Sequence, residues 1–218
     1  MDVIGHKFGP EAPEMLAAVQ EADAAVARLL AGLERLGQRD AANLVVVSDH
    51  GLSETSPDRV IFLEDLMDVS TVQVESTGPN GGVRPKSATA AELAASIRAR
   101  APPQLQVFLR EDVPGHLHYR DNPRIPPVVL IADDRWMIES KVGWPKYVPT
   151  YGRGNHGWDP ATPNMGALFI ASGPAFRPGV QIDDVENVHL YNLLCAVLGL
   201  TPAPNDGDQR LARAALSH

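Results

Sequence analysis

Three short stretches of the sequence carry residue types that bind metal ions. They are MDVIGHKFGP with Asp2 and His6, VVVSDHGLSE with Asp49 and His50, and GRGNHGWDP with His156. Carboxylate oxygens and imidazole nitrogens are good zinc ligands. Taken alone, each stretch is better explained by an exposed histidine or by an acid at a turn. Taken together, they predict that five donors from three separate segments meet in one site.

Five donors are more than one tetrahedral zinc ion takes, so the set predicts two neighbouring metal ions. Two metals about 3.5–4 Å apart can clamp the attacking and leaving oxygens of a phosphoryl transfer. By count, Asp2, His6 and His156 would give three ligands to one metal. Asp49 and His50 would leave the other metal one protein ligand short. Zinc is favoured over manganese by the ligand types.

The donors are expected at strand ends and in loops. Leu44–Ser48 is a continuous apolar run, which is typical of a strand buried on both faces of a parallel sheet. Gly51 lets the backbone turn directly after it, so Asp49 and His50 can converge at the edge where open α/β sheets bind ligands. Val3, Ile4 and Gly5 are poor helix formers, so Asp2 and His6 are expected in a strand-end loop.

Helical and strand patterns alternate along the chain, which is typical of a layered α/β fold. Apolar residues recur at helical spacing from Pro13 to Gln38, and Gly37 fits the helix end. Further helices are expected after Thr89 and from Asn187. Strands are expected in the segments STVQVES, GVRP, LQVFLRE, HLHYR, PPVVLIADD and MGALFIASGP. Residues of about 60–140 are interpreted as a smaller inserted α+β subregion, and 141–162 as an irregular, functional loop.

Composition excludes some classes of function. The 218 residues carry a formal charge of −8 and no run of Lys or Arg, which argues against binding a nucleic-acid polymer. No apolar stretch approaches the roughly 20 residues of a membrane span. The single Cys195 lies in an apolar helical run, so it is expected to be buried, without a disulfide.

The three stretches and the tail MGALFIASGPAFRPG…ENVHLYNLLCAVLGLTPAPNDG resemble the nucleotide pyrophosphatase/phosphodiesterase family of the alkaline phosphatase superfamily. They match its blocks D-x-x-G-H-x-x-G-P, S-D-H-G-M and G-x-H-G-Y-D in order across essentially the whole chain. Leu52 and Trp158 are small departures from that pattern. The resemblance implies a three-layer, mostly parallel sheet flanked by helices, with residues 1–218 as the carboxyl-terminal part of the catalytic domain and the N-terminal part of the sheet missing.

The resemblance also implies a chemistry. Family members look like two-zinc hydrolases of phosphodiester or pyrophosphate bonds in nucleotides and other small molecules. Asp2, His6 and His156 would hold one Zn²⁺ and Asp49 and His50 the other. A threonine nucleophile, an aspartate ligand and a phosphate-binding asparagine are expected upstream, so no catalytic nucleophile is expected in this chain. The family suggests a periplasmic or secreted location.

Three alternatives remain open. The chain as given could bind zinc without turning over substrate, since the nucleophile would be absent. It could also belong to a phosphomonoesterase, sulfatase or phosphomutase of the same superfamily, although the tail favours the phosphodiesterase branch. Finally, Asp159 is either an acceptor behind the metal ligands for an imidazole N–H or the start of a turn before Pro160.

Overall fold

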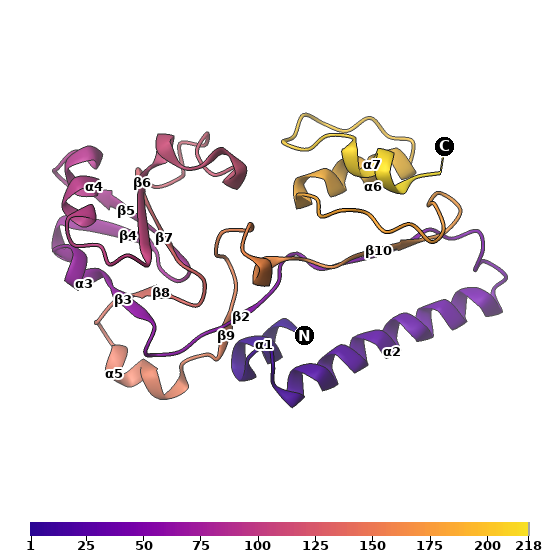
Figure 1. Ribbon diagram of the computed structural model, residues 1–218, viewed down its shortest axis with the longest axis horizontal. Coiled ribbons are helices and arrows are strands. Elements are labelled where there is room, and N and C mark those ends of the chain that lie inside the picture. Colours follow the sequence, from indigo (N-terminus) through magenta and orange to yellow (C-terminus); the bar gives the residue numbers. More distant parts are fainter. Residues whose placement is uncertain (218) are drawn as a thin grey trace. The chain divides into compact units, whose positions relative to one another are not determined.

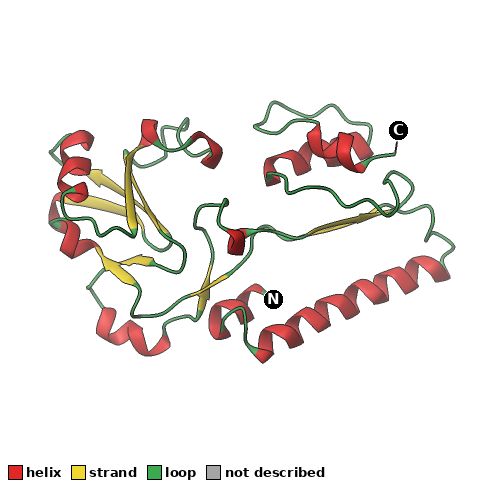
Figure 2. Ribbon diagram, in the orientation of Figure 1, coloured by secondary structure: helices red, strands yellow, loops and turns green. Residues whose placement is uncertain are grey.

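The structure, a computed structural model, describes residues 1–217 and divides into two compact units. Unit 1 combines residues 1–20 with 50–166, and unit 2 combines residues 21–49 with the chain from 167 onward. Both mix helices and strands, as the α/β prediction requires (Figure 2).

The core of unit 1 is a four-stranded antiparallel sheet (Figure 1). Its strands, in spatial order, are β4 (Val72–Ser76), β5 (Asn80–Pro85), β7 (Val128–Ala132) and β6 (Leu105–Leu109). All five residues of β7 are buried, so this strand is the centre of the unit. The strands expected from STVQVES, GVRP, LQVFLRE and PPVVLIADD are thereby confirmed.

Helix α4 (Ala90–Arg98) packs on this sheet through the buried side chains of Leu93 and Ile97. Its start is fixed by a reciprocal capping box. The Thr89 hydroxyl accepts a hydrogen bond from the Glu92 backbone N–H, and the Glu92 carboxylate accepts one from the Thr89 N–H. The predicted helix after Thr89 is confirmed.

Shorter elements complete unit 1. Strand β3 (Val60–Phe62) pairs in parallel with β8 (Met137–Glu139), and β2 (Ser53–Glu54) pairs antiparallel with β9 (Gly154–Asn155). The α-helices are α1 (Asp2–Phe8), α3 (Leu63–Leu66) and α5 (Trp144–Tyr147). Single 3₁₀ turns lie at Val69–Thr71, Arg110–Asp112, Gly115–Leu117, Val148–Thr150 and Pro163–Met165.

Two local predictions in unit 1 are wrong. HLHYR forms no strand, because the chain makes a 3₁₀ turn at Gly115–Leu117 and His118 is left-handed, with φ 47°. Residues 2–6 form the helix α1 rather than a loop. The poor propensity of Gly5 is outweighed because Gly5 is buried where α1 contacts β9.

Helix α2 (Pro13–Arg35) confirms the predicted helix from Pro13, and most of it belongs to unit 2. As expected, Gly37 terminates the helix: it follows the last helical turn in a left-handed conformation, with φ 65°. The Gly37 N–H donates to the Glu34 carbonyl and the Gln38 N–H to the Leu33 carbonyl, the pattern of a Schellman motif.

The other elements of unit 2 are β1 (Leu44–Val47), β10 (Phe169–Ser172), a 3₁₀ turn at Asn187–His189, α6 (Leu190–Val197) and α7 (Arg210–Ala215). Strands β1 and β10 form an antiparallel pair. The expectation that β1 is buried on both faces is wrong. Val45 packs on the core of Phe176, Leu193 and Leu211, whereas Ile170, which pairs with Val46 on the opposite face, is 54% exposed. Only one face of this two-stranded ladder is covered within unit 2.

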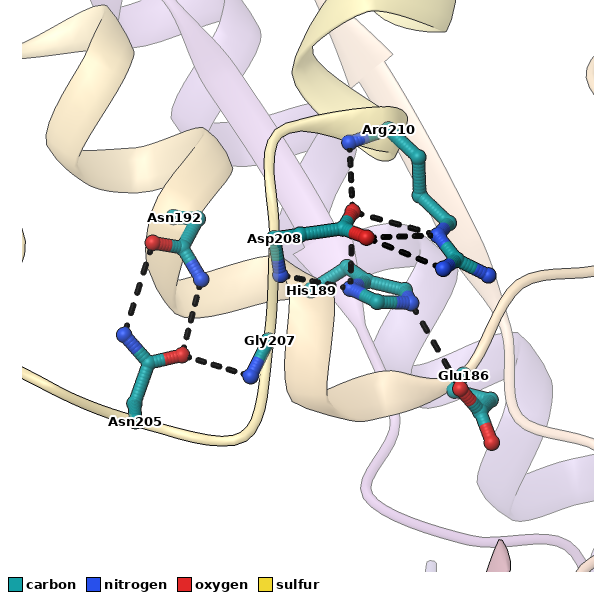
Figure 3. Close-up of polar contacts among 7 residues, drawn as sticks. All are labelled: Glu186, His189, Asn192, Asn205, Gly207, Asp208 and Arg210. Carbon is teal, nitrogen blue, oxygen red and sulfur yellow. Dashed lines mark hydrogen bonds and ion pairs between the residues drawn. The ribbon is translucent and has the colours of Figure 1, made fainter.

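Polar side chains tie the end of the chain to α6 (Figure 3). The Asn192 and Asn205 amides pair with each other. The buried His189 accepts a hydrogen bond at Nδ1 from the Asp208 backbone N–H, 2.9 Å away. Cys195 on α6 is buried and free, as predicted. No helix within residues 1–217 is both long enough and apolar enough to cross a membrane.

Candidate metal centre

Three predicted donors meet in unit 1. One ligand atom each from Asp2, His6 and His156 lies within 4.8 Å of the other two. Asp2 and His6 lie at the start of the unit, and His156 follows 150 or more positions later in the chain. On α1, Asp2 and His6 are four residues apart, so the helix places both on one face. The helix that was not predicted is therefore what brings this pair together.

The donor spacing suits a single zinc ion. Ligands about 2.1 Å from a tetrahedral zinc stand about 3.4 Å apart. The Oδ1 atom of Asp2 lies 3.3 Å from Nε2 of His6 and 3.7 Å from Nε2 of His156. The three side chains are 30–54% exposed, so the cluster is open on one side. One carboxylate with two imidazoles is a normal zinc donor set.

The His6 imidazole is oriented by the backbone of β9. Its Nδ1 donates a hydrogen bond to the Gly154 carbonyl, 2.8 Å away. This bond assigns the ring proton to Nδ1, so Nε2 carries the lone pair that a metal needs. A Cβ on Gly154 would lie 2.5 Å from the Gly5 carbonyl oxygen. Glycine at position 154 thus lets α1 approach β9 closely enough for this bond.

The His156 side chain leaves a loop directly after β9. The Asn155 side-chain oxygen accepts a hydrogen bond from the His156 backbone N–H, and the Asn80 amide donates to the Gly157 carbonyl, each at 2.8 Å. Gly157 has φ 106°, a conformation that residues with a Cβ rarely adopt. The loop is therefore held on both sides of the imidazole.

The His50 ring stacks on the His156 ring, with centroids 3.4 Å apart and planes 11° apart. Nδ1 of His50 donates to the Gly51 carbonyl at 2.8 Å, so Nε2 again carries the lone pair. The stack places the His50 ring beside the three-donor cluster, of which His156 is a member.

The remaining predicted residues are placed as follows. Asp49 directly precedes His50 but is grouped with unit 2, so its pairing with His50 around a second metal stays a prediction. The Asp159 carboxylate lies 3.0 Å from Nε2 of His116 and accepts from the Ala161 N–H, as expected at the start of a turn. A role for Asp159 behind the metal ligands also stays a prediction.

The interpretation of the sequence missed the groups that orient the imidazoles. They are the carbonyls of Gly51 and Gly154 and the side chains of Asn80 and Asn155. The glycines next to the histidines were the only sign of them in the sequence. Backbone carbonyls leave no signature of their own, because every residue has one.

Comparison with known proteins places the chain in a family. A family model described as type I phosphodiesterase / nucleotide pyrophosphatase matches residues 1–159. Mouse ectonucleotide pyrophosphatase/phosphodiesterase family member 1 is 37% identical over 215 residues, covering 94% of this chain and 23% of that protein. The bovine bis(5'-adenosyl)-triphosphatase ENPP4 is 34% identical over 207 residues, covering 94% and 44%.

A solved structure extends the match to the fold. Mouse ectonucleotide pyrophosphatase/phosphodiesterase 5 superposes with a TM-score of 0.87 at 32% identity, covering 98% of this chain and 56% of that one. A second solved structure shows an inactive variant of the same mouse protein in complex with AMP. The match confirms the alkaline phosphatase-like α/β fold. The chain spans about half, or less, of the length of these relatives. It belongs to the type I phosphodiesterase / nucleotide pyrophosphatase family.

Proposed function

We propose that the chain is the metal-binding part of a hydrolase of phosphodiester and pyrophosphate bonds in small molecules such as nucleotides. The observation that carries this proposal is the meeting of Asp2, His6 and His156 in a member of this family. These residues would hold one Zn²⁺, and Asp49 with His50 would contribute to a second. Bound zinc would polarise the phosphoryl oxygens and activate the attacking hydroxyl.

The protein's own residues supply position and charge. The Asp2 carboxylate adds the negative charge that offsets a dication, and it faces both His6 and His156. The hydrogen bonds that His6 donates to Gly154 and His50 donates to Gly51 fix the orientation of each ring and leave Nε2 as the nitrogen that would face a metal. Little rearrangement is then needed on binding, so the site is preorganised for a cation.

The attacking group is expected to be a threonine hydroxyl outside these 218 residues. This expectation rests on the family resemblance, as does the periplasmic or secreted location. A second candidate function follows from the partial coverage of the relatives, which is 23–56% for those compared above. In that case the 218 residues bind zinc and turn over nothing unless another polypeptide segment supplies the nucleophile.

One set of assays separates the candidates. With zinc, the 218-residue chain is incubated with bis(4-nitrophenyl) phosphate, 4-nitrophenyl phosphate and 4-nitrophenyl sulfate, while bound zinc is measured in parallel. We expect about one or two equivalents of bound zinc and no hydrolysis above that of free zinc. If an open reading frame precedes the Met1 codon, the longer polypeptide should prefer the diester by at least about 10-fold.

The controls define what would contradict the proposal. His156→Ala should abolish zinc binding at the three-donor site, whereas His116→Ala, which removes an exposed imidazole bonded to Asp159, should not. Turnover by the 218 residues that is lost in His156→Ala would show that the nucleophile is present after all. A preference for the sulfate or the monoester would favour another branch of the superfamily.

A further inference from the structure

One turn of unit 1 is hydrogen-bonded to both segments that carry the stacked imidazoles of His50 and His156. The turn, Asp133–Trp136, joins the buried strand β7 to β8. It is closed by a hydrogen bond that the Trp136 N–H donates to the Asp133 carbonyl, 2.9 Å away. None of its side chains belongs to the predicted metal donors.

The side chain of Asp134 in this turn accepts two hydrogen bonds. The Ser53 hydroxyl donates to one carboxylate oxygen, and the Asn164 amide donates to the other at 2.8 Å. Ser53 is only 1% exposed, so its hydroxyl would lose much of its solvation without gaining a partner if the acceptor were removed. Hydrogen bonds to a charged acceptor are stronger than those between neutral groups. The carboxylate therefore anchors two separate segments to the turn.

Both of these segments fix the backbone that follows His50. Ser53 lies three positions after His50, in β2. Between them, Gly51 is packed so closely that a Cβ there would overlap the Asn164 carbonyl oxygen. The Gly51 carbonyl is also the acceptor that orients the His50 ring. Because Asp134 bonds to Ser53 and to Asn164, it holds this contact from both sides.

The same turn reaches the His156 loop through its backbone. The Trp136 carbonyl accepts a hydrogen bond from the indole N–H of Trp158, 2.8 Å away. Trp158 is 4% exposed and lies two positions after His156. The ladder of β2 and β9 also joins the two histidine segments, but over only two residue pairs. So short a ladder is weak by itself, and the turn supplies a second link between the segments.

The backbone of the turn is in an unfavourable conformation. Arg135 has φ 70°, in the left-handed region that residues with a Cβ rarely adopt. Such a conformation persists where its surroundings determine it, and it is enriched at functional sites. Here the Arg59 guanidinium donates to the Arg135 carbonyl at 3.3 Å, next to the two bonds of Asp134. The turn is thus a fixed support for the groups bonded to it.

We propose that Asp134 is a positioning residue that sets the placement of the His50 imidazole against that of His156. It acts through Ser53 and Asn164 and is not itself a metal donor. The proposal rests on the proposed function, because metal binding is what makes the placement of the two rings matter. The placement itself can be measured without a metal.

Labelling with diethyl pyrocarbonate measures this placement in the metal-free chain. The reagent modifies neutral imidazoles, and mass spectrometry of peptides gives the rate at each histidine. In Asp134→Ala the rates at His50 and His156 should rise about 3- to 10-fold, which corresponds to the net contribution of one hydrogen bond. The rate at His118, an exposed histidine of the same unit, should not change.

Two substitutions in the same turn are the controls. Asp133→Ala removes an exposed carboxylate and keeps the backbone hydrogen bond to Trp136, so the rates should stay as in the unaltered chain. Asp134→Asn keeps an oxygen for the Asn164 amide and offers an N–H to the Ser53 hydroxyl oxygen. It should restore the rates to near those of the unaltered chain, which a general loss of stability would not explain.

A third substitution decides the question if Asp134→Ala does not fold. Asn164→Ala changes an exposed side chain and removes one of the two hydrogen bonds to Asp134, so the His50 rate should again rise. Unchanged rates at His50 and His156 in the folded Asp134→Ala variant would overturn the proposal. So would an equal rise in Asp133→Ala, or an unchanged His50 rate in Asn164→Ala where that variant decides.

Zinc calorimetry on the same variants connects the placement to the metal site. Asp134→Ala should weaken zinc binding at least about 10-fold, as loss of a group that orients metal ligands typically does. Asp133→Ala and Asp134→Asn should bind zinc nearly as well as the unaltered chain. An unaltered chain that takes up no zinc would overturn the proposed function, and the labelling rates would still show whether Asp134 positions the two rings.

Discussion

At the scale of single residues, the candidate site depends on which nitrogen of each imidazole is protonated. His6 and His50 each donate a hydrogen bond from Nδ1 to a glycine carbonyl oxygen, at 2.8 Å in both cases. Nε2 is thereby prepared for a metal, without any change in the ring's orientation. The donor types were predictable from sequence, because Asp and His are chemically distinctive. Their tautomers were not, because the acceptors are backbone groups that only the fold brings close.

Glu139 offers a test of how burial affects a carboxyl group. Burial raises its pKa, so the folded chain disfavours the carboxylate relative to the unfolded chain. The neutral Glu139 carboxyl contributes fully to stability below the unfolded pKa of about 4.3. This contribution is lost as the pH rises through the higher pKa of the folded chain. Glu139→Gln should therefore raise the melting temperature at pH 7 and leave it nearly unchanged at pH 4.

Thermal unfolding followed by circular dichroism at both pH values measures this difference. Glu11→Gln is the control, because it removes the charge of an exposed carboxylate in the same way. A Glu139→Gln variant that is no more stable at pH 7 than the unaltered chain would mean that the carboxylate is adequately solvated.

At the scale of elements, the contact between α1 and β9 decides where the donors lie. Sequence predicted the long helix α2 and the capped helix α4, because periodicity and capping residues act locally. It did not predict α1. Local propensity argues against a helix at Val3–Gly5, and what overrides it is the packing of Gly5 against residues some 150 positions later.

Substituting one glycine tests this contact. In Gly154→Ala the new methyl group would meet the Gly5 carbonyl oxygen at 2.5 Å, so α1 must move away from β9. We expect a loss of about 1–3 kcal/mol in the free energy of unfolding, as for other overpacked sites. Zinc affinity should also fall at least about 10-fold, because Asp2 and His6 move with α1.

Gly32→Ala is the matched control. Gly32 is inside α2, and a Cβ there meets nothing closer than the Arg35 side chain at 3.8 Å. This change should stabilise the helix by about 0.5–1 kcal/mol and leave zinc affinity unchanged. Denaturant titrations and zinc calorimetry on both variants measure the two effects. Unchanged zinc affinity in Gly154→Ala would show that zinc binding does not depend on the contact between α1 and β9.

At the scale of the whole molecule, much apolar surface is exposed. No residue of α2 is buried, and the exposed positions in unit 2 include Leu29, Leu36 and Ile170. The sequence predicted the apolar stripe of α2 and the strand β10 correctly. It did not indicate which residues would cover them, because an apolar pattern indicates that a face can be buried and says nothing about its partner.

Exposed apolar surface of this kind predicts self-association. The purified chain should elute as concentration-dependent oligomers in size-exclusion chromatography with light scattering. The double substitution Leu29→Lys and Leu36→Lys changes one exposed position inside α2 and one directly after it, and it should shift the chain towards monomer. A monodisperse monomer with a sharp unfolding transition at about 100 µM would contradict this expectation.

Anomalous X-ray diffraction at the zinc edge tests the central claim most directly. The claim is that Asp2, His6 and His156 together hold one metal ion. Crystals of the chain grown with zinc should show an anomalous peak about 2.0–2.2 Å from an Asp2 carboxylate oxygen and from Nε2 of both histidines. Zinc bound at other sites, with no peak at these three donors, would contradict the account.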